Sequence, residues 1–291
     1  MVFAVIGGDE RQVRLAVQLL RDGHEVRTFA MEVAALAPGI KHSDGAYEAV
    51  RGAECVVLPL PTSVKKGYLN APLGSEAHCI GEILGAMEPG QLAACGMPDA
   101  DTSAMARRRG VVLRDYYLRE ELLAENAVAT AEGAIGVIMK ETVETVWKKR
   151  VLIIGRGRIA KALAPRLKAL GALVAVSARN AGDLAWIETD GFEALDTRAL
   201  EGCLGGFDIV VNTVPSLVLG MQRLSELPQS ALVIDLASKP GGVDFEAAQV
   251  LGIRTLWAQG LPGKWAPETA ASAIRKAVYN ILEEESIEGR T

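Results

Sequence analysis

The chain has 291 residues, of which 49% are hydrophobic and 23% are charged. These proportions are ordinary for a globular protein and exclude a disordered or fibrous one. The net charge is only −5, and the one basic triplet, residues 107–109, is interpreted as a solvated helix end. We therefore expect no nucleic-acid partner. No apolar run reaches the roughly 18 residues that a membrane span needs, so we expect no membrane partner either.

Residues 1–8 lack a basic leader and a small-residue cleavage site. We interpret them as a first core strand rather than as a signal peptide. The four cysteines are scattered without a CxxC pair, and the three histidines add no metal-ligand spacing. We therefore expect reduced cysteines, no metal site and a cytoplasmic protein.

A repeated pattern organises the chain. An apolar run at residues 3–7 ends on glycine, a stretch of helical spacing follows it, and Gly23 precedes a second apolar run. The same series returns 148 positions later, which places Gly7 on Gly155 and Gly23 on Gly171. Strand, glycine turn, helix, glycine stop and strand form the opening of a doubly wound domain. We predict an α/β fold of two doubly wound, Rossmann-like domains with an inter-domain cleft.

The remaining elements follow in chain order. Further strands are expected at residues 54–59, 111–115, 151–154, 173–177, 207–211, 232–236 and 255–257. The predicted domains are an N-terminal substrate-side domain at 1–125, a linking helix at 126–149, a dinucleotide-binding domain at 150–267, and a C-terminal helix at 268–291 that packs back on the first domain. Pro165 falls inside the helix of the second copy, where it predicts a kink.

The second glycine turn carries a dinucleotide fingerprint. It runs Gly155, Arg156, Gly157, Arg158, Ile159, Ala160 and matches G-x-G-x-x-A directly after an apolar strand. The first glycine allows a tight turn, the second lets the backbone approach a pyrophosphate, and the alanine allows close packing of helix on strand. The helix N-terminus then offers free N–H groups to the phosphates.

The end of the second strand of this domain favours NADP over NAD. An NAD site places an acid there to hold the ribose 2′-hydroxyl. This chain has Ser177, Arg179 and Asn180 instead, and no acid before Asp183. Arginine pairs with a 2′-phosphate, and the two polar side chains can donate hydrogen bonds to it. NADP is the predicted cofactor, with NAD as the alternative and a surface arginine as the bland interpretation.

The first copy breaks the fingerprint, because Asp9 stands where Gly157 stands in the second. A carboxylate there opposes a diphosphate, so we expect no dinucleotide in the first domain. Its turn at Gly8 and Asp9 is expected to hold substrate instead.

Polar exits follow the later strands of the second domain. Asn212, Thr213, Val214 and Pro215 are expected to flank the nicotinamide ribose, and segments 235–242 and 259–263 leave the same edge of the sheet. The second half holds no histidine, so Asp, Glu or Lys must supply any general acid or base. The candidates are Asp9, Glu132, Asp235 and Lys239; for each of them a structural cap or ion pair is an equally open interpretation.

Several segments together resemble the dipicolinate synthase A family. They are residues 6–12, 130–133, 212–216, 235–242 and 260–270, spread over nearly the whole chain. The resemblance implies an enzyme of the mother cell of spore-forming bacteria, which oxidises a dihydrodipicolinate-type intermediate to pyridine-2,6-dicarboxylate with a nicotinamide as hydride acceptor. It also implies a smaller, flavoprotein-like partner, dipicolinate synthase B.

A small dicarboxylate substrate needs anion anchors. The residues expected to contact it are Gly8, Asp9, Arg11, Thr130, Ser238, Lys239 and Thr269. Two other functions stay open: a nicotinamide-binding regulatory or scaffold protein, and another two-domain dehydrogenase of the alanine or shikimate dehydrogenase type. A homo-oligomer is also compatible with the sequence.

Overall fold

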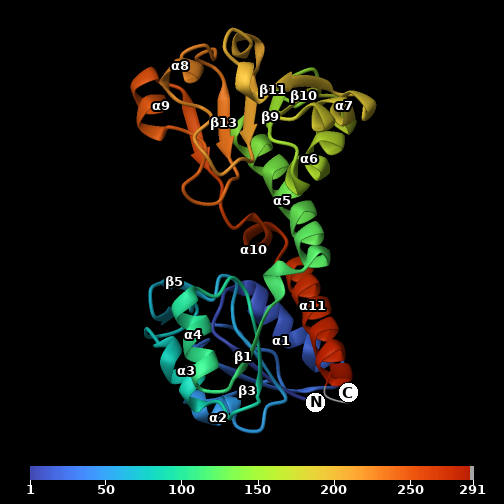
Figure 1. The fold of residues 1–291 in the computed structure, drawn as a ribbon. Coiled ribbons are helices and arrows are strands. Elements are labelled where there is room, and N and C mark those ends of the chain that lie inside the picture. The colour runs from blue at the N-terminus through green and yellow to red at the C-terminus, as the bar shows by residue number, and fades with distance from the viewer. Residues whose placement is uncertain (289–291) are drawn as a thin grey trace. The chain divides into compact units, whose positions relative to one another are not determined.

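The chain forms two compact units, which a computed structural model describes for residues 1–288 (Figure 1). Unit 1 holds Met1–Asn126 together with the C-terminal segment that begins at Ala266, and unit 2 is Ala127–Trp265. Residues 289–291 of the predicted C-terminal helix lie outside the described part.

Unit 1 is built on a six-stranded parallel sheet of order β3-β2-β1-β4-β7-β8. Its strands are β1 (Val2–Ile6), β2 (Glu25–Phe29), β3 (Lys41–His42), β4 (Cys55–Val57), β7 (Leu92–Cys95) and β8 (Val112–Asp115), with a separate hairpin of β5 (Ser63–Lys65) and β6 (Tyr68–Leu69). Its helices are α1 (Glu10–Arg21), α2 (Ala46–Val50), α3 (Ile80–Ala86), α4 (Ala100–Arg108), a 3-10 turn at Tyr116–Leu118 and α11 (Pro267–Glu288).

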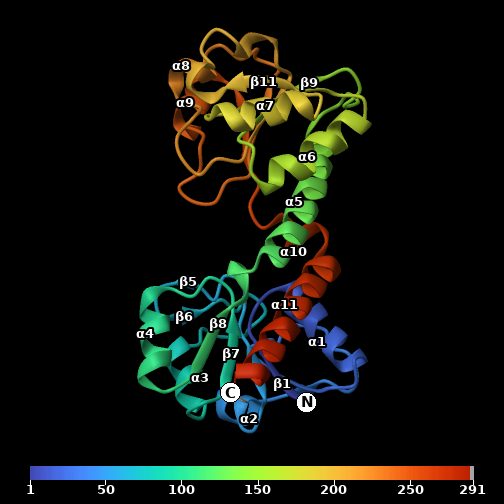
Figure 2. The same cartoon turned by 45° about the vertical axis from the view of Figure 1, so that its right-hand side comes forward.

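Alternating residues of each central strand serve two cores, because successive side chains point to opposite faces of a sheet. In β1, Phe3 and Val5 pack with α1 and α11, whereas Ala4 and Ile6 pack with α2, α3 and α4. The pairing of α1 with α11 is visible in both views of the ribbon (Figures 1 and 2). The C-terminal helix therefore supplies part of the core of unit 1.

Unit 2 repeats this plan with the strand order β11-β10-β9-β12-β13-β14, again all parallel. Its strands are β9 (Arg150–Ile154), β10 (Leu173–Ala178), β11 (Glu193–Asp196), β12 (Ile209–Asn212), β13 (Leu232–Asp235) and β14 (Arg254–Trp257). Its helices are α6 (Arg158–Ala169), α7 (Ala181–Thr189), α8 (Met221–Leu224), α9 (Phe245–Leu251) and α10 (Leu261–Trp265), with 3-10 turns at Thr197–Ala199 and Leu204–Gly206. Both sheets have the strand order of a dinucleotide-binding fold, which reverses direction between its first and fourth strands.

The repeat seen in the sequence is also a repeat of structure. β1 and α1 have the same lengths as β9 and α6, and both pairs of elements are offset by 148 positions. α6 continues through Pro165 to Ala169. The predicted α/β fold of two doubly wound domains is confirmed.

Helix α5 (Glu120–Glu141) starts and ends earlier than the linking helix expected at 126–149. It is the one described helix that is long and apolar enough to cross a membrane by length and composition, which alone is weak evidence. Its apolar side chains belong to two cores: Leu122 packs in unit 1, and Ala134 and Ile138 pack in unit 2. Burial in these cores accounts for its composition.

Candidate functional site

The glycine turn of unit 2 has the geometry that its fingerprint requires. Gly155 has a φ of +97°, and a Cβ atom there would lie 2.6 Å from Thr213 Oγ1 and 2.8 Å from Val214 Cγ2. Thr213 is held in place because its hydroxyl donates to the carbonyl oxygen of Ile154 at 2.8 Å. Only glycine fits at position 155 without strain or a clash.

The N-terminus of α6 is open to an anion. Gly157 is its N-cap, and no side chain caps the first turn. A Cβ atom built on Gly157 would meet no atom within 4 Å, so the space above the turn is free. Because the first N–H groups of a helix have no partner inside it, they can bind phosphate oxygens. Gly155, Gly157 and the backbone at Ile159 therefore fit a pyrophosphate.

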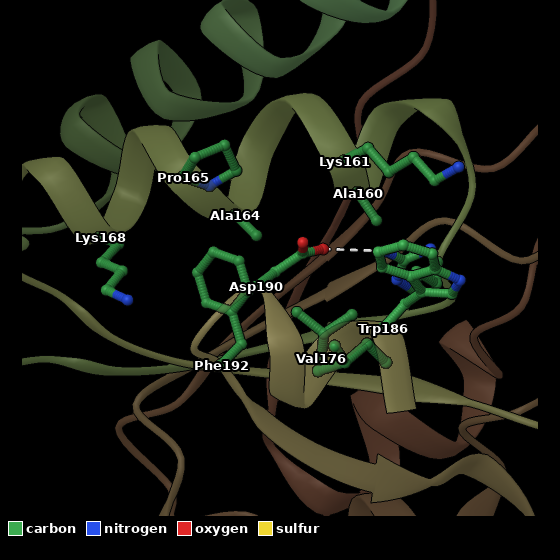
Figure 3. A pocket seen from close by; sticks show the side chains of 11 residues that line it. Ala160, Lys161, Ala164, Pro165, Lys168, Val176, Trp186, Asp190 and Phe192 are labelled. Atoms are coloured by element: carbon green, nitrogen blue, oxygen red, sulfur yellow. Dashed lines mark hydrogen bonds and ion pairs between the residues drawn. The ribbon is translucent and has the colours of Figure 1, made fainter. Parts of the chain in front are cut away.

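Arg156 points away from this anion site. Its side chain is only 10% exposed and pairs with Asp190 at 2.8 Å and with Asp183 at 3.7 Å. It borders a cavity of about 700 Å³ between α6 and α7, which has an apolar floor that includes Ala164 and Val176 (Figure 3). Arg156 therefore braces the turn against α7. Arg158, at the start of α6, is exposed.

Of the three side chains expected at a 2′-phosphate, only Arg179 is available. Ser177 is fully buried and accepts a hydrogen bond from Thr197 Oγ1 at 2.9 Å. Asn180 is the N-cap of α7, where it accepts from the amide of Asp183 and donates to its carboxylate. The expectation that Ser177 and Asn180 donate to a phosphate is therefore disfavoured, because one faces the core and the other is used as a cap. Arg179 is exposed and follows β10 directly.

The exit from β12 is held by a buried network rather than offered to a ligand. Asn212 is fully buried, donates to the Val214 carbonyl at 3.0 Å and to Asp235 at 2.8 Å, and accepts from the Val214 amide. Its interactions shape the turn that carries Thr213 and Val214. Pro215, next along, is exposed. Thr213, Val214 and Pro215 therefore remain candidates for the wall beside the nicotinamide ribose, with Asn212 as their support.

Asp235 orders the next loop. Its carboxylate is fully buried and accepts hydrogen bonds from Asn212 and from the backbone amides of Ala237 at 3.0 Å and Gly242 at 2.7 Å. The same loop is tied from outside, where Trp257 Nε1 donates to the Ala237 carbonyl. A buried carboxylate with three donors has a structural role here, which disfavours the expectation that Asp235 transfers a proton.

The other expected contacts of unit 2 differ in their surroundings. Ser238 and Lys239 are exposed at the tip of the loop that Asp235 orders. Glu132 is exposed on α5 and forms an ion pair with Arg166 at 3.4 Å. Thr130 is half-buried on the same helix. Lys239 is the acid–base candidate of this unit that no other side chain holds in place among the described residues.

In unit 1, Asp9 and Arg11 are brought together, but they bind each other. Asp9 is the N-cap of α1 and accepts from the Arg11 amide at 3.1 Å. The Arg11 guanidinium forms a bidentate pair with Asp9 at 2.9 and 2.8 Å and donates to the Leu60 carbonyl. Burial opposes the charge on Arg11, but the hydrogen bond and charge of Asp9 outweigh it, so the pKa of Arg11 is raised. This pair weakens the case for Arg11 as a free anion anchor. Thr269, at the start of α11, is exposed.

The groove that would hold a dinucleotide in unit 1 is filled by its own chain. The amide of Gly8 donates to the Asn70 carbonyl at 2.8 Å, and the amide of Val33 donates to the Leu73 carbonyl at 3.0 Å. A Cβ atom on Gly7 would lie 2.7 Å from the Leu69 side chain. Segment 69–73 therefore covers the first glycine turn, which supports the interpretation that unit 1 binds no dinucleotide. No local sequence signal distinguishes this segment from an ordinary surface loop.

Comparisons with known proteins agree with this division. Residues 2–117 match the family described as the dipicolinate synthase A N-terminal domain, and residues 123–243 match the D-isomer specific 2-hydroxyacid dehydrogenase, NAD binding domain. The chain is 29% identical to dipicolinate synthase A of Bacillus subtilis (strain 168) over 301 positions, which cover 97% of this chain and 95% of that protein.

Solved structures show the same similarity. Dipicolinate synthase A from Bacillus halodurans has a TM-score of 0.86 at 27% identity, with 97% of each chain covered. An L-alanine dehydrogenase, 16% identical, has a TM-score of 0.66 over 99% of this chain and 91% of its own. The second likeness shows a shared fold. The match of residues 123–243 confirms the prediction that this part of the chain binds a nicotinamide dinucleotide.

Proposed function

Because the chain belongs to the dipicolinate synthase A family, to which it is related over 97% of its length, we propose that it oxidises a dihydrodipicolinate-type intermediate to pyridine-2,6-dicarboxylate with NADP. Its nicotinamide-binding domain makes it an NAD(P)-dependent dehydrogenase. The choice of NADP and the identity of the substrate are the proposal.

One observation carries the cofactor part of the proposal. The uncapped N-terminus of α6, with open space over Gly157, stands next to a β10 strand that ends in an exposed Arg179 rather than in an acid. The helix end suits a pyrophosphate, and the guanidinium suits a 2′-phosphate. A bound nicotinamide would supply a hydride acceptor.

The substrate part rests on the exposed polar residues. Lys239 is exposed in the loop ordered by Asp235, and a lysine at such a position can pair with a carboxylate. Ser238 and Thr269 are exposed hydroxyls that can donate to the same kind of group. Loss of a hydride and a proton from the dihydro ring gives an aromatic product, so a modest base is sufficient. Asp9 and Glu132, each ion-paired, are the carboxylates proposed for that proton.

The setting proposed for this reaction follows the same family. We propose that the chain works in the cytoplasm of the mother cell during sporulation, together with the flavoprotein-like dipicolinate synthase B. A homo-oligomer of the chain is compatible with this setting.

The test is turnover by the purified chain with its folded partner protein. Freshly prepared dihydrodipicolinate should cause NADP to be reduced, measured as NADPH absorbance. Lys239→Met should raise the KM for the dicarboxylate and leave NADP affinity unchanged. No reduction of either NADP or NAD by the intact complex would refute the proposal.

The carboxylate geometry favours one alternative, a nicotinamide-binding protein with a regulatory role. Asp9, Glu132 and Asp235 are all engaged in caps, ion pairs or loop contacts. If the variants Asp9→Asn, Glu132→Gln and Lys239→Met each leave activity of the complex intact while cofactor still binds, the chemistry belongs to the partner protein.

A further inference from the structure

Gln12 has a buried amide that nothing in the described structure satisfies. It lies in the first turn of α1 and is 2% exposed. Neither its Nε2 atom nor its Oε1 atom has a hydrogen-bond partner among the described residues. Burying an amide without hydrogen bonds is costly, and native proteins seldom keep one without a reason.

The position of Gln12 in the repeat makes the residue unusual. With the offset of 148, it corresponds to Ala160, the small residue that lets the helix of a dinucleotide fingerprint pack closely on its strand. A long amide therefore occupies a position where the other copy has a methyl group. Gly8 makes room for it, because a Cβ atom on Gly8 would lie 2.1 Å from Gln12 Cγ.

The amide lies at the switch point of the unit 1 sheet. Gln12 contacts the space around Gly8, which follows β1, and the same space is bordered by Pro59, which follows β4. β1 and β4 are neighbours, and the strand order reverses between them. In open α/β sheets, ligands bind in the crevice outside the carboxyl ends of the strands at this point.

The surroundings limit what could bind there. Segment 69–73 covers the glycine turn, so a dinucleotide does not fit. Asp9 and Arg11 neutralise each other beside the crevice. An amide offers one donor and one acceptor side by side. It therefore complements a small ligand with an acceptor next to an N–H group.

We propose that Gln12 is a substrate-positioning residue: Nε2 donates to a ring carboxylate of the substrate, and Oε1 accepts from the protonated ring nitrogen beside it. This inference rests on the proposed function, whose substrate carries carboxylates next to a ring nitrogen. Because the amide is covered in this structure, binding includes a displacement of the chain that covers it.

Gln12→Met tests this role, because methionine keeps the unbranched shape and removes both polar atoms. Removal of an unsatisfied buried amide should leave the melting temperature equal or higher. The KM for dihydrodipicolinate should rise roughly 10- to 100-fold, as expected for the loss of hydrogen bonds that include one to a charged group. NADP affinity should not change. Gln18→Met, the same substitution on the same helix, is the matched control and should leave KM unchanged.

The outcomes separate this inference from the proposed function. If wild-type complex turns over and a folded Gln12→Met variant keeps the wild-type KM, Gln12 has no role in binding and only this inference fails. If wild type does not turn over, calorimetric titration with pyridine-2,6-dicarboxylate decides: binding that is lost in Gln12→Met supports the inference alone, and no binding to wild type overturns both. Gln12→Leu replaces the methionine variant if the latter does not fold.

Discussion

Arg179 is the residue on which the cofactor preference depends, since Ser177 and Asn180 are occupied by Thr197 and Asp183. We expect Arg179→Ala to weaken NADPH binding roughly 10- to 100-fold, which corresponds to the loss of a charge-assisted hydrogen bond to the 2′-phosphate. NADH, which lacks this phosphate, should bind almost as before. Fluorescence titration with both nucleotides measures the two affinities.

Arg254→Ala is a suitable control for this experiment. Arg254 begins β14 and pairs with Glu141 at the opposite edge of the sheet from the carboxyl ends, where the cofactor binds. It should affect both nucleotides equally. A matching loss of NADPH and NADH affinity in Arg179→Ala would mean that the guanidinium does not contact the 2′-phosphate.

Residue roles were predictable from sequence where the backbone alone decides them. Gly155 and Gly157 have the positive φ or the open space that their spacing implies. The direction of a side chain is decided by partners far along the chain, as with Asp235 and Asn212, which bind each other across 23 positions. A position after a strand therefore marked the right loop but did not separate a ligand contact from a structural anchor.

At the scale of elements, the strong strands were predicted and the weak ones were not. β9 and β13 are runs of buried branched residues. β7 reads Leu-Ala-Ala-Cys and β11 reads Glu-Ala-Leu-Asp, so neither has the branched or aromatic residues that mark a strand. Both are strands because neighbouring parallel strands pair with them.

The contact of α5 with α11 should depend on acid pH through Glu121. A hydrogen bond from Arg119, helped by one from Asn280, lowers the pKa of Glu121 to about 2 from its ordinary value of 4.5. Because the pKa is depressed in the folded state, this stabilisation is present above about pH 4.5 and is lost as pH falls toward about 2. The urea midpoints of wild type and Glu121→Gln should therefore differ near neutral pH and converge in acid.

Glu125→Gln is the matched variant at the same helix contact. It removes the more exposed ion pair with Lys276, so its effect should be smaller at every pH. A difference between wild type and Glu121→Gln that stays constant from neutral pH down to about 2 would contradict the assignment.

At the scale of the whole molecule, the resemblance to dipicolinate synthase A is confirmed along 97% of the chain. The segments at 235–242 and 260–270 were informative because they combine glycine and proline with polar residues in a fixed order. The path of α11 was not readable from any motif. It depends on which apolar surface the helix covers, which only the packed structure shows.

That path makes the C-terminal segment necessary for unit 1 although it follows unit 2 in the chain. Ile274, Val278 and Ile281 are buried in the core of unit 1. At about 1.5–3 kcal/mol for each buried side chain, they contribute roughly 5–9 kcal/mol. This is comparable to the entire stability of an ordinary domain, about 5–15 kcal/mol. Truncation after Trp265 should therefore unfold unit 1.

Unit 2 should survive this truncation, because residues 127–265 form its contacts without α11. Calorimetry of the truncated chain should retain a single transition that NADPH shifts upward, and limited proteolysis should remove residues 1–126 first. Ile274→Asp should reproduce the loss, since it places a charge in the same core, whereas Lys276→Ala, at an exposed ion pair, should not. Protease resistance of unit 1 in the truncated chain would show that α11 is dispensable for its core.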